Sequence, residues 1–149
     1  MDISKTNSLV ELFFNKLKKV EQKRQFLRWL KPGKNQKYTW NEVGEKIHKL
    51  SNKIKSFIKE GDRCLLVSEN RPDWLIADIA IMNAGGISVP IFTTYSANDY
   101  EYILNDCKPS VIIVSNRDQF KKIKKYISPA IKKIISFEKI DEESLVVEN

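Results

Sequence analysis

The sequence is poor in cysteine, histidine and glycine, and each shortage excludes a class of protein. Its two cysteines, Cys64 and Cys107, lie in apolar segments, so we expect buried, reduced thiols and no disulfide. The one histidine, His48, has no Cys-x-x-Cys or His-Glu-x-x-His pattern beside it, which argues against a metal centre. The sequence also has no nucleophile-elbow pattern to accompany this histidine, which argues against a Ser–His–Asp catalytic triad. The five glycines form neither G-x-G-x-x-G nor G-x-x-x-x-G-K-S/T, so these two phosphate-binding loops are excluded.

Long hydrophobic runs are also missing. Runs such as residues 76–82 are short and contain Asp78, far from the roughly 20 apolar residues of a membrane span. The first five residues contain neither an apolar core nor a small-residue cleavage site. We therefore expect no secretory signal and a cytoplasmic protein.

The net charge of +7 comes from 21 lysines and only 5 arginines. Arginine is the residue suited to bidentate phosphate and guanine contacts, so its scarcity argues against a nucleic-acid partner. We interpret the lysine pairs at 121–122, 124–125 and 132–133 as solvated faces, compatible with weak peripheral attraction to the inner, anionic face of a membrane.

The chain of 149 residues suits one ordinary domain or a piece of a larger one. Ser8 and Glu11 form a capping-box pattern that predicts a helix over 9–22. Short strands at 26–30 and 36–38, separated by a turn, predict a hairpin. A second capping box at Thr39 and Glu42 predicts a helix of four to five turns, ended by Gly61.

From residue 64 onward, apolar strands alternate with helices. Strands are predicted at 64–67, 87–92, 111–114 and within 131–137, and helices at 72–84, 97–105 and 117–127. Strands that are apolar on both faces, joined by helices, indicate an α/β fold with a mostly parallel sheet. The acidic residues 141–144 of the tail are expected to fray.

Two loops at strand ends contain polar side chains that could take part in catalysis or binding. Residues 68–73 follow one strand, and Glu69 and Asp73 there could act as acid and base, although Asn70 or Arg71 capping a helix is the simpler interpretation. Residues 93–96 could hold an anion, but Ser96 is better explained as a helix cap with Asp99.

Other conspicuous residues have structural interpretations. Gly85 and Gly86 follow a helix, which is the wrong end for phosphate, so we interpret them as a C-terminal cap. The three tryptophans lie in apolar patterns and are predicted to be core residues; they are Trp29, Trp40 and Trp74. No residue is assigned a catalytic, cofactor-binding or metal-binding role from these patterns.

Ordered blocks of sequence resemble a known family. They are YTWNEV (38–43), GDRCLLVSENRPDW (61–74) and ADIAIMNAGGISVPI (77–91), extended by 93–95 and 102–106. In this order they are similar to the opening of the AMP-forming acyl-CoA synthetases of the adenylate-forming superfamily, in particular the long-chain fatty acid–CoA ligases. The resemblance covers about residues 9–135.

The resemblance implies an incomplete, N-terminal portion of the adenylate-forming ligase fold and a two-step reaction. A fatty acid attacks Mg-ATP to give an acyl-adenylate, and coenzyme A then displaces AMP. ATP, Mg²⁺ and CoA are thus implied for the complete enzyme. The family's phosphate loop and catalytic lysine domain have no counterpart in these residues and are expected beyond Asn149, so we expect no ligase activity from this chain alone.

The resemblance also suggests a division into an N-terminal flank (1–37), the first part of an AMP-binding domain (38–140) and an acidic tail (141–149). The missing C-terminal part could be a separate chain, making this one subunit of a split ligase. The alternative is a non-catalytic module that binds an acyl chain or a protein.

Overall fold

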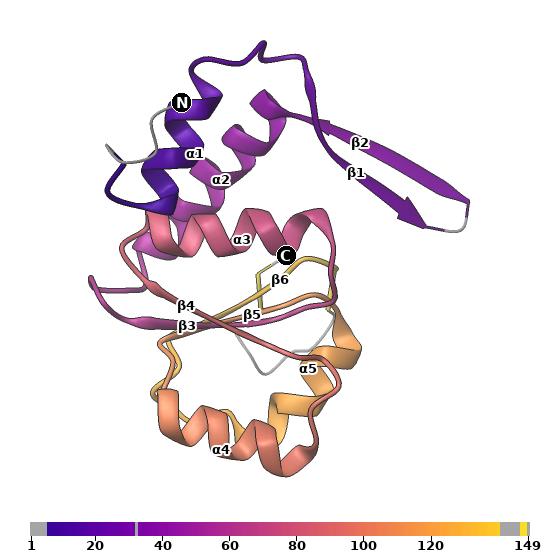
Figure 1. Ribbon diagram of the computed structural model, residues 1–149. Helices are drawn as coiled ribbons and strands as arrows, with labels where there is room; N and C mark the ends of the chain where they lie inside the picture. The colour runs from indigo at the N-terminus through magenta and orange to yellow at the C-terminus, as the bar shows by residue number, and fades with distance from the viewer. Residues whose placement is uncertain (1–5, 32, 141–146, 149) are drawn as a thin grey trace.

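The computed structural model describes residues 6–31, 33–140 and 147–148, and it has an α/β fold with a central parallel sheet. Figure 1 shows α3 on one side of the sheet, α4 and α5 on the other, and a two-stranded hairpin that extends away from both. The predicted fold class is confirmed, including the N-terminal helix and the hairpin.

Helix α1 (Leu9–Leu17) begins as predicted and ends earlier than predicted. The hydroxyl of Ser8 accepts a hydrogen bond from the Glu11 N–H, 3.1 Å away, as the capping pattern requires. The helix was expected to reach residue 22, but residues 18–24 contain a single apolar residue, Val20. Because short helices are held mainly by packing of an apolar face, the segment turns away instead.

The hairpin consists of β1 (Gln25–Lys31) and β2 (Lys34–Thr39), which pair antiparallel. It leads directly into α2 (Trp40–Lys55), where the full capping box forms. The Glu42 N–H donates to the Thr39 hydroxyl at 3.2 Å, and the Thr39 N–H donates to the Glu42 carboxylate at 2.7 Å. Two backbone donors at the helix start are thereby satisfied.

The end of α2 differs from the prediction that Gly61 caps it. The helix ends at Lys55, and the Ser56 hydroxyl donates to the Lys53 carbonyl at 2.7 Å. Gly61 instead lies in a later turn with a φ of 81°, and its N–H donates to the Gly85 carbonyl at 2.9 Å. The left-handed conformation was predicted correctly, but it serves a tertiary contact and not a helix end.

Among the described residues, the sheet has five parallel strands in the order β4-β3-β5-β6-β7. They are β3 (Arg63–Val67), β4 (Ile87–Ile91), β5 (Val111–Val114), β6 (Lys133–Ser136) and β7 (Val147–Glu148). Within the predicted tail, β7 pairs with β6; the acidic segment 141–144, predicted to fray, lies outside the described residues.

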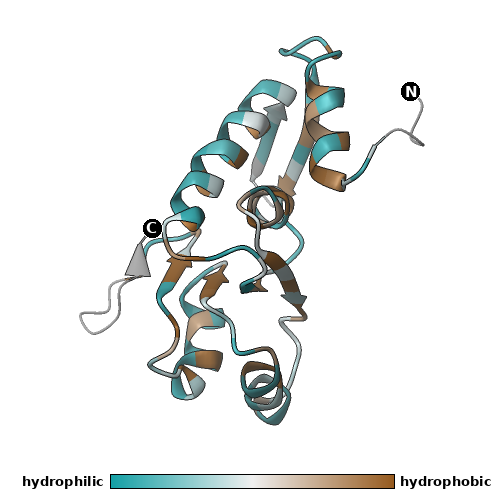
Figure 2. Cartoon of the chain, turned by 90° about the vertical axis from the view of Figure 1, so that its left-hand side faces the viewer, coloured by the Kyte–Doolittle hydropathy of each residue, from teal (hydrophilic) through white to brown (hydrophobic). Residues whose placement is uncertain are grey.

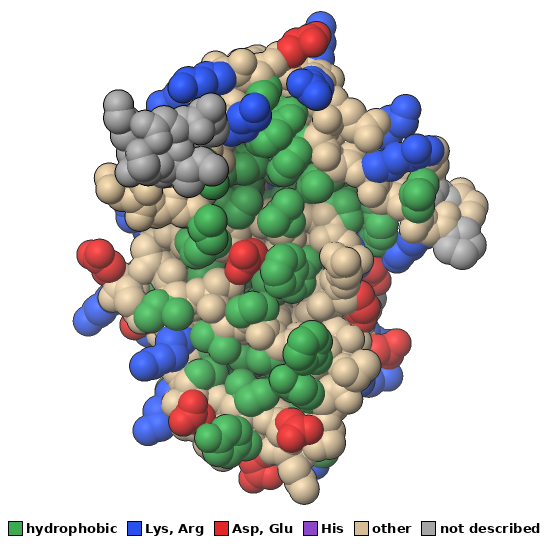
Figure 3. All heavy atoms as spheres, in the orientation of Figure 1, with side chains coloured by type: hydrophobic (Ala, Val, Ile, Leu, Met, Phe, Trp, Pro, Cys, Tyr) green, Lys and Arg blue, Asp and Glu red, His purple; other side chains and the backbone are tan. Residues whose placement is uncertain are grey.

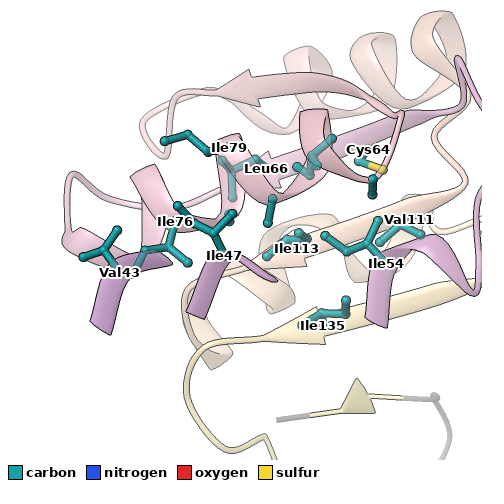
Figure 4. Packing of buried hydrophobic residues seen from close by; sticks show 14 of the residues in the cluster. Val43, Ile47, Ile54, Cys64, Leu66, Ile76, Ile79, Val111, Ile113 and Ile135 are labelled. Carbon is teal, nitrogen blue, oxygen red and sulfur yellow. The ribbon is translucent and has the colours of Figure 1, made fainter. Parts of the chain in front are cut away.

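Both faces of the sheet are covered, which explains its continuous apolar strands. Alternate strand residues such as Leu66, Ile113 and Ile135 pack with α2 and α3, as Figure 4 shows. Their neighbours, such as Leu65 and Ile112, pack with the opposite layer. Hydrophobic residues accordingly concentrate along the central strands (Figure 2).

The connecting helices are α3 (Pro72–Asn83), α4 (Ala97–Cys107) and α5 (Arg117–Ile123), and α5 continues as a 3₁₀ turn at Lys124–Tyr126. Gly85 and Gly86 form the predicted cap of α3. The Gly86 N–H donates to the Ile81 carbonyl at 3.0 Å, and the Gly85 N–H donates to the Met82 carbonyl at 3.1 Å. This pair of bonds is a Schellman motif, with Gly85 at a φ of 88°.

Candidate functional site

The strand order creates a switch point at the carboxyl ends of β3 and β5. From β3 the chain passes through α3 to β4 on one side, and then crosses back through α4 to β5 on the other side of β3. Loops that leave adjacent strands in opposite directions open a crevice, and ligands of open α/β sheets bind there. The loops that start at Ser68 and Ser115 meet at this point.

An open hollow of about 500 Å³ lies beside this point. Its walls come from the loop after β3, the start of α3 and the end of β4; they comprise Ser68, Glu69, Asn70, Trp74, Pro90, Ile91, Phe92 and Thr93. The walls are mostly apolar, with one carboxylate at the rim. This composition is typical of a small-molecule site with few orienting polar groups.

The carboxylate of Glu69 is held by side chains from across the switch point. The Gln119 amide donates to it at 2.7 Å, and the Asn116 amide approaches at 3.5 Å. Burial raises the pKa of Glu69, but hydrogen bonds from neighbouring groups prevail and the net pKa lies below its ordinary value. The group is therefore an ionised acceptor at neutral pH and not a proton donor.

Glu69 and Asp73, the two carboxylates proposed as acid and base, belong to different networks. Asp73 accepts from the Arg71 guanidinium at 2.8 Å, while Arg71 also donates to Glu138 at 2.8 Å. Pro72 opens α3 as predicted, but Arg71 occupies the cap position without a side-chain capping bond. The ion pair of Arg71 and Asp73 thus has a structural role. Of the two carboxylates, only that of Glu69 lines the hollow.

The loop at 93–96 serves mainly to start α4. The hydroxyl of Ser96 accepts from the Asp99 N–H at 3.4 Å, and the Ser96 N–H donates to the Asp99 carboxylate at 2.9 Å. The interpretation of Ser96 as a cap is confirmed. Thr93 lines the hollow, and its carbonyl accepts a hydrogen bond from the Lys122 ammonium.

His48 and Lys133 are placed by packing. The His48 ring stacks on Phe14 with centroids 4.6 Å apart. No cluster of three histidine, cysteine, aspartate or glutamate side chains is found among the described residues. The interpretation of all lysine pairs as solvated is wrong for Lys133, which is 4% exposed with its ammonium 5.1 Å from the centre of the Phe57 ring. Its aliphatic stem packs beside the core of the sheet.

The tryptophans predicted as core residues are half-buried and lie at the rim of the hydrophobic core. Trp29, Trp40 and Trp74 pack against the main cluster.

Both cysteines are buried and without a disulfide, as predicted. Among residues 6–31, 33–140 and 147–148, no helix is both long and apolar enough to cross a membrane.

Sequence reasoning missed Gln119, the principal partner of Glu69. The available signal was positional, because polar residues follow two neighbouring buried strands, at 68–70 and at 115–119. Parallel strands in one sheet present their carboxyl ends at the same edge, so both segments had to meet there.

The chain is similar in sequence to several acyl-CoA ligases. It is 29% identical over 126 residues to fatty acyl-CoA synthetase A of Dictyostelium discoideum, an alignment that covers 78% of this chain and 18% of that protein. It is 33% identical over 96 residues to the long-chain-fatty-acid–CoA ligase ACSBG2 of Xenopus laevis, covering 56% of this chain and 13% of that protein. The chain thus spans less than a fifth of the length of these relatives.

The fold is similar to that of solved ligases. The anthranilate CoA ligase AuaEII, in complex with anthranoyl-AMP, superposes with a TM-score of 0.78 at 22% identity, covering 98% of this chain and 28% of that chain. Coronafacic acid ligase from Pectobacterium brasiliense gives a TM-score of 0.78 at 20% identity, covering 93% and 27%. The family model described as AMP-binding enzyme matches residues 13–149. With that match across nearly all of its length, the chain belongs to the AMP-binding enzyme family.

Proposed function

We propose that this chain forms the N-terminal part of a cytoplasmic, ATP-dependent fatty acid–CoA ligase. The observation that carries the proposal is the family match over residues 13–149, together with relatives named as fatty acyl-CoA ligases. Within such an enzyme this chain would contribute a parallel sheet, its covering helices and the crevice at the switch point.

The described residues do not fit the phosphates of ATP or a Mg²⁺ ion. The sequence has no glycine-rich phosphate loop, and no cluster of three potential metal ligands is found in the part of the chain that the structure describes. We therefore assign no catalytic, cofactor or metal residue to this chain. We propose that ATP, Mg²⁺ and CoA are bound by the rest of the ligase, either in one polypeptide or as a separate chain.

The proposal is tested by grafting. A chimera is made in which this chain replaces the matching segment of the Dictyostelium synthetase, and ATP–pyrophosphate exchange with palmitate is measured. We expect exchange from the chimera and none from the 149-residue chain by itself. A folded chimera that supports no exchange with fatty acids of any length would contradict the proposed function, and exchange by the isolated chain would contradict the assignment of ATP binding elsewhere.

A second candidate is a non-catalytic module that binds an acyl chain. The observation in its favour is the hollow of about 500 Å³ with Trp74, Ile91 and Phe92 in its walls. Titration of the isolated chain with palmitate should then change the emission of Trp74. The variant Trp74→Phe, which keeps the apolar wall, should lose this signal, whereas Trp40→Phe should keep it, because Trp40 lies outside this hollow.

We propose that nucleic acid is not a partner of this chain and that any contact with a membrane is weak. Lys132 lies 3.2 Å from the Asp62 carboxylate, and Lys133 is buried, so this lysine pair does not form an open basic face. We propose that duplex DNA and anionic vesicles do not bind above ~200 mM salt, where binding through phosphate charge alone is strongly weakened. Retention of either at that salt concentration would contradict this.

A further inference from the structure

Helix α3 packs against the sheet and α2 on one side, and its outer side is also largely apolar, with Asp78 as a charged residue within it. Ile76, Ala80 and Ile81 point into the core beneath it. Its other side presents Trp74 and Leu75, which remain half-buried. A surface helix normally presents mostly charged and polar residues to solvent, so large apolar residues on this side of α3 indicate a surface that a partner can cover.

Three hollows follow this outer side of α3 and share residues. The hollow of about 500 Å³ and a second of about 420 Å³ share Trp74, and the second shares Leu75 with a third of about 360 Å³ between α1 and α3. We call this surface the apolar belt; it consists of Leu9, Leu12, Trp74, Leu75, Met82 and Phe92.

Two residues of the belt are open to solvent, and the other four are half-buried. Phe92 is 69% exposed and Leu9 is 65% exposed. In Figure 3 hydrophobic side chains run in a band from the N-terminal helices, past α3, toward the loop after β4, and an acidic side chain lies within the band. Contiguous apolar side chains on a protein surface often mark an interaction site, and we interpret the belt as one.

The adjoining sheet edge limits how a partner can bind. The Ile87 N–H donates to the Asp62 carbonyl at 2.9 Å. The backbone N–H and C=O groups of residues 87, 89 and 91 therefore point toward β3, and those of residues 88 and 90 point away from the sheet. Residue 90 is proline, which has no N–H to donate. The outer edge of β4 is therefore a poor template for an added strand, and a partner must pack by side chains.

The lengths of the relatives indicate which partner covers the apolar belt. This chain corresponds to 18% and 13% of two ligases and to 28% and 27% of two solved ligase chains with the same fold. We propose that the apolar belt is the surface on which the rest of an AMP-binding enzyme packs, through side-chain contacts and not by extending the sheet at β4. This inference rests on the proposed function.

The test compares the same substitutions in two settings, the isolated 149-residue chain and the Dictyostelium chimera. Phe92→Lys and Leu75→Lys place a charge on the belt. Tyr102→Lys is the matched control, because Tyr102 is 70% exposed and lines none of the three hollows. Folding equilibrium constants come from urea unfolding, and backbone protection comes from hydrogen exchange.

In the chimera we expect each belt substitution to lower the folding equilibrium constant at least tenfold, as for a well-packed interface residue, and the control to change it less than twofold. In the isolated chain, Phe92→Lys should leave the constant within twofold, because Phe92 faces water there. Leu75→Lys should lower it less in the isolated chain than in the chimera.

Three outcomes would overturn the inference. They are equal effects of the belt substitutions in both settings, new protection of the Ser88 amide showing an added strand, and a dimer of the isolated chain that Phe92→Lys dissociates, which would assign the belt to a second copy. A folded chimera without pyrophosphate exchange counts against the proposed function and leaves the belt comparison intact. A chimera that does not fold counts against both.

Discussion

The guanidinium carbon of Arg71 lies 4.6 Å from the centroid of the Trp29 indole ring. Trp29 belongs to the hairpin and Arg71 to the start of α3, so this contact joins two elements that are distant in the sequence. Arg71 also donates to Asp73 and Glu138, both at 2.8 Å, and its side chain is 9% exposed. One side chain thus connects the hairpin, α3 and the end of β6.

Replacement of Arg71 by alanine should destabilise the chain by about 2–4 kcal/mol, because two carboxylates lose their partner and the ring of Trp29 loses its cover. Arg71→Lys should recover only part of this, because an ammonium cannot bind two carboxylates in a fixed fork while stacking on a ring. Urea unfolding measures the effect. Arg28→Ala, which removes an exposed hydrogen bond to Asn35, is the control, and an equal loss from it would contradict the assigned role.

Acid should destabilise the chain through Asp62. Hydrogen bonds from the Lys59 N–H, the Ser110 hydroxyl and the Lys132 ammonium lower the pKa of this carboxyl from 3.8 to about 2. Because the folded-state pKa is the lower one, the stabilising contribution is complete above the unfolded value near 4 and is lost as the pH falls toward 2.

Asp62→Asn should therefore reduce the slope of stability against pH between 4 and 2, while the slope at neutral pH stays unchanged. Thermal unfolding across this range is the measurement. Asp106→Asn, at an exposed position on α4, serves as the reference. A slope equal to that of the wild type in Asp62→Asn would show that the carboxyl does not carry this dependence.

The thiols should be unreactive in the folded chain. Burial, with a smaller contribution from the charge of Asp62, raises the pKa of Cys64 to about 12, and burial likewise raises the pKa of Cys107. The thiolate is the reactive form, so Ellman's reagent at pH 8 should modify neither residue until urea unfolds the chain. Rapid modification of Cys107→Ser, which retains only Cys64, would contradict the burial of Cys64.

The cap of α3 requires the left-handed conformation of Gly85. Alanine at this position should destabilise the chain by about 1–2 kcal/mol, because an L side chain clashes with the backbone at a φ of 88°. Gly85→Asn should cost less, since asparagine tolerates this region. Urea unfolding distinguishes the two, and an alanine variant as stable as the asparagine variant would argue against strain as the cause.

Much of the fold could be predicted from the sequence because its signals are local. The capping boxes at Thr39 and Ser96 formed as predicted, since each involves residues three positions apart. The strands around Leu66 and Ile113 were identified by apolar runs, and the order of motifs correctly indicated the family. The proposed boundaries at 37 and 140 stay predictions.

The candidate site was only partly predictable. Glu69 was singled out, but its partner Gln119 lies 50 positions away, and their contact depends on the strand order β4-β3-β5. The periodicity of a helix or strand shows which face is apolar and does not show which strand lies beside which.

The sequence by itself determined where the helices begin, which faces are apolar and which family the chain resembles, because these depend on neighbours within a few residues. Only the tertiary structure decided that Lys133 is buried, that Gly61 bonds to Gly85 and that Arg71 joins the hairpin to the sheet. These contacts follow from how elements pack in space, where a side chain's environment is set by residues far along the chain.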